Sequence, residues 1–167
     1  MKMIVSADNN WGIGYKGKLL AHVSTDMKFF REKTINNVVI LGKKTLSTFP
    51  GEKPLKDRTN IILTRDKNYK KEEAVVVNSI DELLEYVKNY DTDRLYVIGG
   101  GTVYKELMPY CDIAYITKFN KEFIADTYIE NFDKDKNWML EEESEVFEDK
   151  GMQFKFCTYK RINHSNC

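Results

Sequence analysis

Short apolar runs rich in β-branched residues recur along the chain, and segments with apolar residues at helical spacing separate several of them. The runs lie at Ile4–Val5, Val38–Leu41, Ile61–Thr64, Ala74–Val77 and Leu95–Ile98. This alternation predicts an α/β fold: a mostly parallel, twisted central sheet with helices on both faces.

Two helices and a terminal hairpin can be placed from the same pattern. Thr25–Lys33 carries Met27 and Phe30 on one stripe. Ser79–Glu82 has the composition of a capping box and opens a helix whose inward side chains are Leu83, Leu84 and Val87. Met139–Phe147 and Met152–Tyr159, joined through Glu148–Gly151, predict an antiparallel hairpin at the sheet edge.

The length of 167 residues suits one domain, which buries roughly 70% of the surface that the unfolded chain exposes. Phe49–Pro54 is a turn-rich connection, but no repeat or low-complexity linker divides the sequence. We therefore treat residues 1–167 as a single domain.

Charge and composition exclude several classes of function. Lys plus Arg equal Asp plus Glu at 26 each, so no global field draws the protein to nucleic acid or to an anionic membrane. The first residues are too weakly apolar for a signal peptide, and no run reaches the length of a membrane span. Cys111, Cys157 and Cys167 form no C-x-x-C pair, which fits a reducing cytoplasm, and His22 and His164 lack metal-site spacing, so we expect no metal.

Three consecutive glycines, Gly99, Gly100 and Gly101, join an apolar run to a helical pattern that stops at Pro109. A turn without side chains lets a ligand approach the backbone, and a helix start presents unpaired N–H groups to an anion. The pattern favours a phosphate-bearing cofactor, although a tight turn alone would explain one or two of the glycines.

A second strand-to-helix junction, Gly42–Thr45, carries Lys43, Lys44 and a threonine hydroxyl that suit another phosphate. Arg65 follows the next strand, at the carboxyl end of the sheet, where ligands of open α/β folds bind. Together these cations favour NADP over NAD. Each lysine alone is equally well explained as part of a solvated helix start.

Asp26 and Arg58 are candidates for substrate recognition. Asp26 lies in a first helical turn close to Phe29 and Phe30, where its carboxylate could grip a flat, amidine-like heterocycle through two parallel hydrogen bonds. Helix-dipole stabilisation alone would also explain an acid at this position. Arg58 could pair with a substrate carboxylate in a forked manner, or be an ordinary surface arginine.

These features, in this order and spacing, resemble the dihydrofolate reductase family of the bacterial chromosomal type over nearly the whole chain. The resemblance rests on Asp26, Gly42–Thr45, Arg58 and Ile98–Tyr104, and it extends to Trp11–Gly14, Thr117, Asp126–Thr127 and Trp138. It implies NADPH-dependent reduction of 7,8-dihydrofolate to tetrahydrofolate by hydride transfer to C6 and protonation of N5 from a water. It also implies a monomeric cytoplasmic enzyme of one-carbon metabolism and thymidylate synthesis that antifolate inhibitors bind.

The resemblance also implies roles for individual residues. Asp26 would fix and polarise the pterin, Thr117 would hydrogen-bond to Asp26, and Arg58 would hold the glutamate carboxylate. Ile4 and Ile98 would offer carbonyls to the pterin amino group, and the Gly99–Gly100 peptide would be cis. The implied catalytic residue is Asp26. The implied substrate-binding set is Ile4, Val5, Leu19, Met27, Phe30, Phe49, Leu55, Arg58, Ile98, Tyr104 and Thr117.

NADPH would place its phosphates at the helix starts after Gly42 and Gly101, with its adenosine 2′-phosphate near Lys43 and Arg65. The implied cofactor-binding set is Ser6, Ile13, Gly14, Gly42, Lys43, Lys44, Thr45, Leu63, Thr64, Arg65, Gly99, Gly100, Gly101, Thr102, Val103 and Tyr104.

The chain departs from the family where the mobile loop meets the Asp26 helix. Leu19-Leu20-Ala21 replaces the usual Leu-Pro-Trp, and Ser24 replaces a proline. We expect Ala21 to leave a larger, wetter space that weakens loop closure and alters inhibitor fit, with Trp11 as a candidate for partial compensation. Ile129-Glu130 also replaces an aromatic–proline pair.

Two other functions remain open from the sequence. One is a reductase of the same fold acting on another nitrogen heterocycle, such as the pyrimidine intermediate of riboflavin synthesis, which Asp26 and Arg58 argue against. The other is a nucleotide-binding protein that keeps affinity for NADPH but has lost catalysis.

Overall fold

A computed structural model of the chain describes residues 1–162 and contains a nine-stranded sheet of order β10-β12-β8-β1-β7-β4-β5-β6, with β11 also pairing with β12. The strands from β8 to β6 in this order are parallel, as the apolar runs predict. They are β1 (Lys2–Ala7), β4 (Val38–Gly42), β5 (Thr59–Leu63), β6 (Val75–Val77), β7 (Leu95–Gly99) and β8 (Ile113–Phe119).

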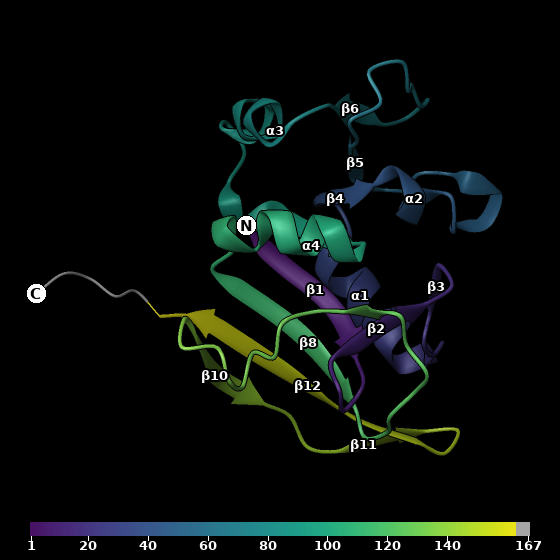
Figure 1. The fold of residues 1–167 in the computed structure, drawn as a ribbon, viewed down its shortest axis with the longest axis vertical. Coiled ribbons are helices and arrows are strands. Elements are labelled where there is room, and N and C mark those ends of the chain that lie inside the picture. Colours follow the sequence, from purple (N-terminus) through teal and green to yellow (C-terminus); the bar gives the residue numbers. More distant parts are fainter. Residues whose placement is uncertain (163–167) are drawn as a thin grey trace, which may run out of the picture.

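Helices cover both faces of this sheet, so the predicted layering is confirmed (Figure 1). Successive residues of β4 point to opposite faces of the sheet. Ile40 packs in one hydrophobic cluster with residues of α3 (Ile80–Val87) and α4 (Gly101–Leu107). Leu41 packs in the cluster of α1 (Ser24–Thr34) and α2 (Lys43–Leu46). Because both faces are covered, central strands such as β4, with the sequence VVILG, carry no alternation of apolar and polar residues.

A second, three-stranded sheet follows the order β3-β2-β9 and is not predicted from the apolar pattern. Its strands, β2 (Gly12–Tyr15), β3 (Lys18–Leu19) and β9 (Thr127–Tyr128), are too short to show an alternation. The remaining regular elements are three short 3₁₀ helices, η1 (Pro50–Glu52), η2 (Thr92–Arg94) and η3 (Met108–Tyr110), among the described residues.

The predicted terminal hairpin is correct at its turn and wrong in its first arm. Lys150 and Gly151 have positive φ angles of 50° and 82° and connect β11 (Phe147–Asp149) to β12 (Met152–Arg161). The first arm is broken, because Ser144 turns its hydroxyl to accept the Phe156 N–H at 2.8 Å. The earlier part is a separate strand, β10 (Trp138–Glu143), so β12 is internal and β10 forms the edge.

The expected capping box is confirmed in one half. Ser79 Oγ accepts a hydrogen bond from the Glu82 N–H at 3.0 Å, whereas the Glu82 carboxylate accepts from the Asn78 N–H at 2.9 Å and not from that of Ser79. Leu83 and Val87 are buried as predicted, and Leu84 is half-buried. At the other helix, α1 begins at Ser24 without a side-chain cap.

The cysteines, the histidines and the lengths of the helices indicate little about the function. Cys111 and Cys157 are buried and free, and His22 is exposed; Cys167 and His164 lie outside the described residues. Within residues 1–162 no group of three or more His, Cys, Asp or Glu is placed to hold a metal ion. Across the same residues, every helix is too short or too polar to cross a membrane.

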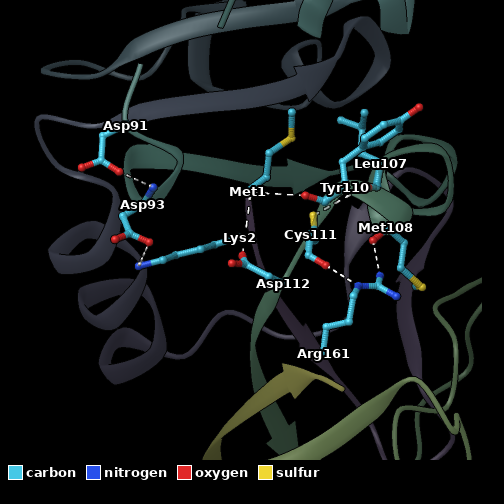
Figure 2. A network of polar contacts seen from close by, with 10 residues as sticks. All are labelled: Met1, Lys2, Asp91, Asp93, Leu107, Met108, Tyr110, Cys111, Asp112 and Arg161. Carbon is cyan, nitrogen blue, oxygen red and sulfur yellow. Dashed lines mark hydrogen bonds and ion pairs between the residues drawn. The ribbon is translucent and has the colours of Figure 1, made fainter. Parts of the chain in front are cut away.

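A polar network ties the last strand to the end of α4 (Figure 2). Arg161 donates from Nε to the Cys111 carbonyl at 2.7 Å and from a terminal nitrogen to the Met108 carbonyl, and its guanidinium lies 4.5 Å from the Trp138 ring centroid. The amino group of Met1 donates to the Tyr110 carbonyl at 3.2 Å. The network therefore stabilises the end of the sheet where the parallel strands have their amino ends, opposite their carboxyl ends.

Arg161→Met should lower the free energy of unfolding by about 1–3 kcal/mol, because two carbonyls lose their charged donor. Urea unfolding measures this change, with the exposed neighbour Lys160→Met as the matched control. Equal midpoints for the two variants would show that the guanidinium contributes no more than a surface lysine.

Candidate active site

A cleft of about 2270 Å³ opens at the carboxyl ends of the parallel strands, between these ends, α1 and the β2–β3 loop. Its walls include Ser6 at the end of β1, Gly42 at the end of β4 and Leu63 at the end of β5. All residues of the substrate-binding and cofactor-binding sets expected from the sequence line this one cleft. The structure thus brings the whole expected constellation together, while the role of each residue stays a prediction.

The glycine turn between β7 and α4 has geometry that only glycines accommodate. Gly99 has φ +120°, and the Gly99–Gly100 peptide is cis, as the family resemblance implies. A Cβ at Gly101 would lie 2.6 Å from Thr127 Cγ2, and one at Gly100 would lie 3.0 Å from Thr45 Oγ1. The protein's own packing therefore accounts for glycine here, independently of any ligand.

Asp26 projects from the first turn of α1 into the cleft, where its carboxylate is largely buried. Burial raises the pKa of Asp26, and a hydrogen bond from Thr117 Oγ1 to Asp26 Oδ1 at 2.6 Å lowers it in part. The expected Thr117–Asp26 contact is confirmed. Since dipole stabilisation requires no burial, the buried setting favours a functional carboxylate over a simple helix-start acid.

Tyr104 closes the floor of the cleft beneath the glycine turn. Its hydroxyl donates to the Ile4 carbonyl at 2.8 Å, and burial raises the pKa of Tyr104 far above its ordinary value. The phenol is therefore a neutral donor at physiological pH. It holds α4 to β1 at the level where the Ile4 carbonyl was expected to meet a ligand.

Arg58 is half-buried at the α1 side of the cleft and is held in place by two hydrogen bonds. Nε donates to the Lys56 carbonyl at 2.9 Å, and Nη1 donates to Thr34 Oγ1 at 3.2 Å. Burial lowers the pKa of Arg58, and the nearby positive charge of Arg31 lowers it further. An anion bound here would relieve both costs.

Two of the three cations expected at the phosphate positions, Lys43 and Arg65, already face carboxylates. Lys43 Nζ lies 3.1 Å from Asp66 Oδ2, and an Arg65 terminal nitrogen lies 3.6 Å from Glu106 Oε1. The acidic partners of these cations are not apparent from the sequence pattern. This part of the cleft is therefore less positive than the lysine–arginine pattern suggests.

The replaced loop segment is only partly a cleft feature. Leu19 and His22 line the cleft, whereas Ala21 packs against Val23, Phe119 and Phe154. Trp11 is buried against Phe132 and lies outside the cleft lining, so its position gives no support to the suggested compensation for Ala21. The expected loosening of loop closure at Ala21 remains a prediction.

Several residues that line the cleft were not predicted from the sequence. Asn78, Ser79 and Asp81 follow β6, so the rule that picked out Arg65, a polar residue after a parallel strand, could have found them. Others carried no local signal, because folding alone brings them to the cleft. They include Lys16, His22, Lys28, Arg31, Glu106 and Tyr110.

Comparisons with known proteins agree with this geometry. The sequence profile of the family described as "Dihydrofolate reductase" matches residues 1–161. The chain is 38% identical to the dihydrofolate reductase of Enterococcus faecium over 136 residues, 81% of this chain and 80% of the relative. It is 32% identical to that of Sus scrofa over 183 residues, 98% of each chain.

A solved structure shows the same fold. The dihydrofolate reductase from Enterococcus faecalis, complexed with NADP(H) and RAB-propyl, superposes with a TM-score of 0.86 at 35% sequence identity, over 97% of this chain and 96% of that one. The match spans the central sheet and the cleft. The chain therefore belongs to the dihydrofolate reductase family, a family of NADPH-dependent oxidoreductases.

Proposed function

We propose that this protein reduces 7,8-dihydrofolate to 5,6,7,8-tetrahydrofolate with NADPH, by hydride transfer to C6 and protonation of N5. The observation that carries the proposal is the buried Asp26 carboxylate, hydrogen-bonded to Thr117 in a cleft that continues to the glycine turn. Family membership supplies the reaction class.

The residues along the cleft fit NADPH. Thr45 and Thr102 offer hydroxyls in the first turns of α2 and α4. Lys43 and Lys44, at the start of α2, and Arg65, after β5, offer cations. Hydroxyls, backbone N–H groups and cations are the donors that phosphates require. When bound, NADPH supplies the hydride; the protein orients the reactants and keeps bulk water out.

Asp26 recognises the heterocycle. A carboxylate accepts about four hydrogen bonds, so the Thr117 contact leaves room for two parallel bonds from an amidine-like edge. Burial strengthens these bonds, since the surroundings screen them less than water does. Phe30 and Leu19 pack on the ring, the carbonyls of Ile4 and Ile98 accept from its amino group, and a water supplies the N5 proton.

Arg58 holds the glutamate carboxylate of the substrate. Its guanidinium is oriented by the Lys56 carbonyl and Thr34 Oγ1, which limits the rotamer entropy lost on binding. The remaining ligand contacts are those of the substrate-binding and cofactor-binding sets given in the sequence analysis.

The wider setting is also a proposal. Residues 1–167 act as one domain and as a monomer in the cytoplasm, serving one-carbon metabolism and thymidylate synthesis. Equal numbers of acidic and basic residues support small-molecule partners without nucleic acid or membrane. Antifolates with an amidine-like edge would compete for Asp26.

Loss of reduced-nicotinamide absorbance tests the proposal, with purified protein, dihydrofolate and either NADPH or NADH. Oxidation that needs dihydrofolate and prefers NADPH supports it. NADPH binding without turnover would favour a non-catalytic protein, and turnover only with a pyrimidine substrate would favour the riboflavin-type reductase.

Asp26→Asn should lower kcat/KM for dihydrofolate by about 100-fold or more, because the amide replaces a charged acceptor with a group that presents a donor to the heterocycle. The Kd for NADPH should stay within about twofold, since Asp26 contacts the heterocycle alone. Steady-state kinetics and cofactor titration give both values. Equal losses in the two would mean that Asp26 is structural.

The same variant should be more stable than the wild type at neutral pH. Burial raises the pKa of Asp26 in the folded protein above that in the unfolded chain. The contribution of the Asp26 carboxyl group to folding stability is therefore fully present below the unfolded pKa of about 3.9. This contribution is lost as the pH rises through the folded pKa. The advantage of Asp26→Asn should therefore grow over that interval and then level off. Urea unfolding across pH checks this, and a pH-independent difference would contradict it.

Thr117→Val should raise the pKa of Asp26 further, because the hydroxyl bond that stabilises the ionised carboxylate is lost. An NMR titration of the Asp26 carboxyl carbon measures the shift. Thr48→Val, at an exposed threonine elsewhere along the cleft, is the matched control. A lower or unchanged pKa in Thr117→Val would refute this account.

A further inference from the structure

Two ion pairs stand at the end of the cleft proposed for the adenosine phosphate. Lys43, at the start of α2, faces Asp66 in the turn after β5, with 3.1 Å between Nζ and Oδ2. Arg65, in the same turn, faces Glu106 on α4, with 3.6 Å between a terminal nitrogen and Oε1. Both cations proposed for the 2′-phosphate are thus already matched by carboxylates.

The Asp66 carboxylate is held in this position by its own turn. Oδ1 accepts from the Asn68 N–H at 3.0 Å, and the Asp66 N–H donates to Thr64 Oγ1 at 3.2 Å. Asn78 fastens the turn to the end of β6 by donating to the Asp66 carbonyl at 3.2 Å. The hydrogen bond from Lys43 is the largest cause that lowers the pKa of Asp66, so the group is charged at neutral pH.

Lys43 is held from a second side as well. Its ammonium lies 4.9 Å from the centroid of the Tyr69 ring, which follows in the same turn. The aromatic face and the carboxylate both stabilise the ammonium in this position when no ligand is bound. Its charge is therefore available to a phosphate only in competition with Asp66.

Glu106 acts from the opposite wall. It lines the cleft and its side chain is 32% exposed, whereas the Arg65 side chain is 94% exposed. Arg65 is thus free to swing towards a ligand, while Glu106 stays close to the cleft. A dianionic phosphate in this position would meet the field of Glu106 as well as that of Arg65.

We propose that Asp66 and Glu106 are specificity-determining residues, which lower the preference for NADPH over NADH by competing with the 2′-phosphate for Lys43 and Arg65. The inference rests on the proposed placement of NADPH. NADH carries a 2′-hydroxyl at this position, which a carboxylate does not repel and from which it can accept a hydrogen bond. The two acids therefore disfavour one cofactor selectively.

The test is the Kd of NADPH and of NADH, measured by fluorescence titration of the intact protein at low and high salt. Asp66→Asn should tighten NADPH about threefold, Glu106→Gln should act in the same direction, and the double variant should exceed either. NADH affinity should stay the same or fall. The gain for NADPH should shrink at high salt, most for Asp66→Asn, because salt screens the exposed Asp66 more than the half-buried Glu106.

Asp93→Asn is the matched control. It makes the same chemical change in another Lys–Asp pair, in which Asp93 Oδ1 lies 3.8 Å from Lys2 Nζ at the amino end of β1, away from the cleft. It should leave the ratio of the two affinities unchanged. If Asp93→Asn tightens NADPH as much as Asp66→Asn does, the effect is one of net charge and the proposal is overturned.

Lys43→Met separates failure of this inference from failure of the placement on which it rests. If it leaves the NADPH-to-NADH ratio unaltered, the 2′-phosphate is not near Lys43 and both are overturned. If it weakens NADPH selectively while Asp66→Asn and Glu106→Gln leave the ratio unchanged, the placement holds and the role of the acids is refuted.

Discussion

The parallel alignment of six neighbouring strands, from β8 to β6 in the sheet order, is the constraint on which the rest of this structure depends. Parallel strands end at the same edge of a sheet, so each crossover returns the chain to one region of space. Ser6, Gly42, Leu63 and Gly99 therefore meet around one cleft although they are far apart in sequence. The Arg161 network lies at the opposite, amino ends of these strands, where it contributes to stability and not to the cleft.

Within the cleft, function and stability make opposing demands on Asp26. Burial raises its pKa, which means that the folded protein bears a free-energy cost for ionising it. The same burial would make the carboxylate a strong acceptor for the proposed heterocycle, because water competes less for it. Thr117 stabilises the ionised form in part, so α1 and β8 together contribute the two groups of the proposed recognition site.

Electrostatics at the other end of the cleft are local and balanced. The chain as a whole has no net charge, and at the proposed phosphate end Lys43 faces Asp66 and Arg65 faces Glu106. Binding a phosphate at these two cations would mean rearranging existing ion pairs. Cofactor choice then depends on how firmly each acid is held, which for Asp66 is set by the turn after β5.

Short continuous apolar runs were sufficient for the strands β1, β4, β5, β6 and β7, because strands that are buried on both sheet faces need apolar residues throughout that run. The capping pattern and the turn residues were likewise sufficient for the start of α3 and for the Lys150–Gly151 turn. Asp26, Arg58 and the glycine turn were also visible locally, and the family resemblance placed them in one site. The β2–β3–β9 sheet, the break at Ser144 and the position of Trp11 were not, since each depends on partners distant in the chain. The ion pairs of Lys43 and Arg65 had the same origin: a residue's charge is encoded in the sequence, but the partner that opposes it is chosen only when the chain folds.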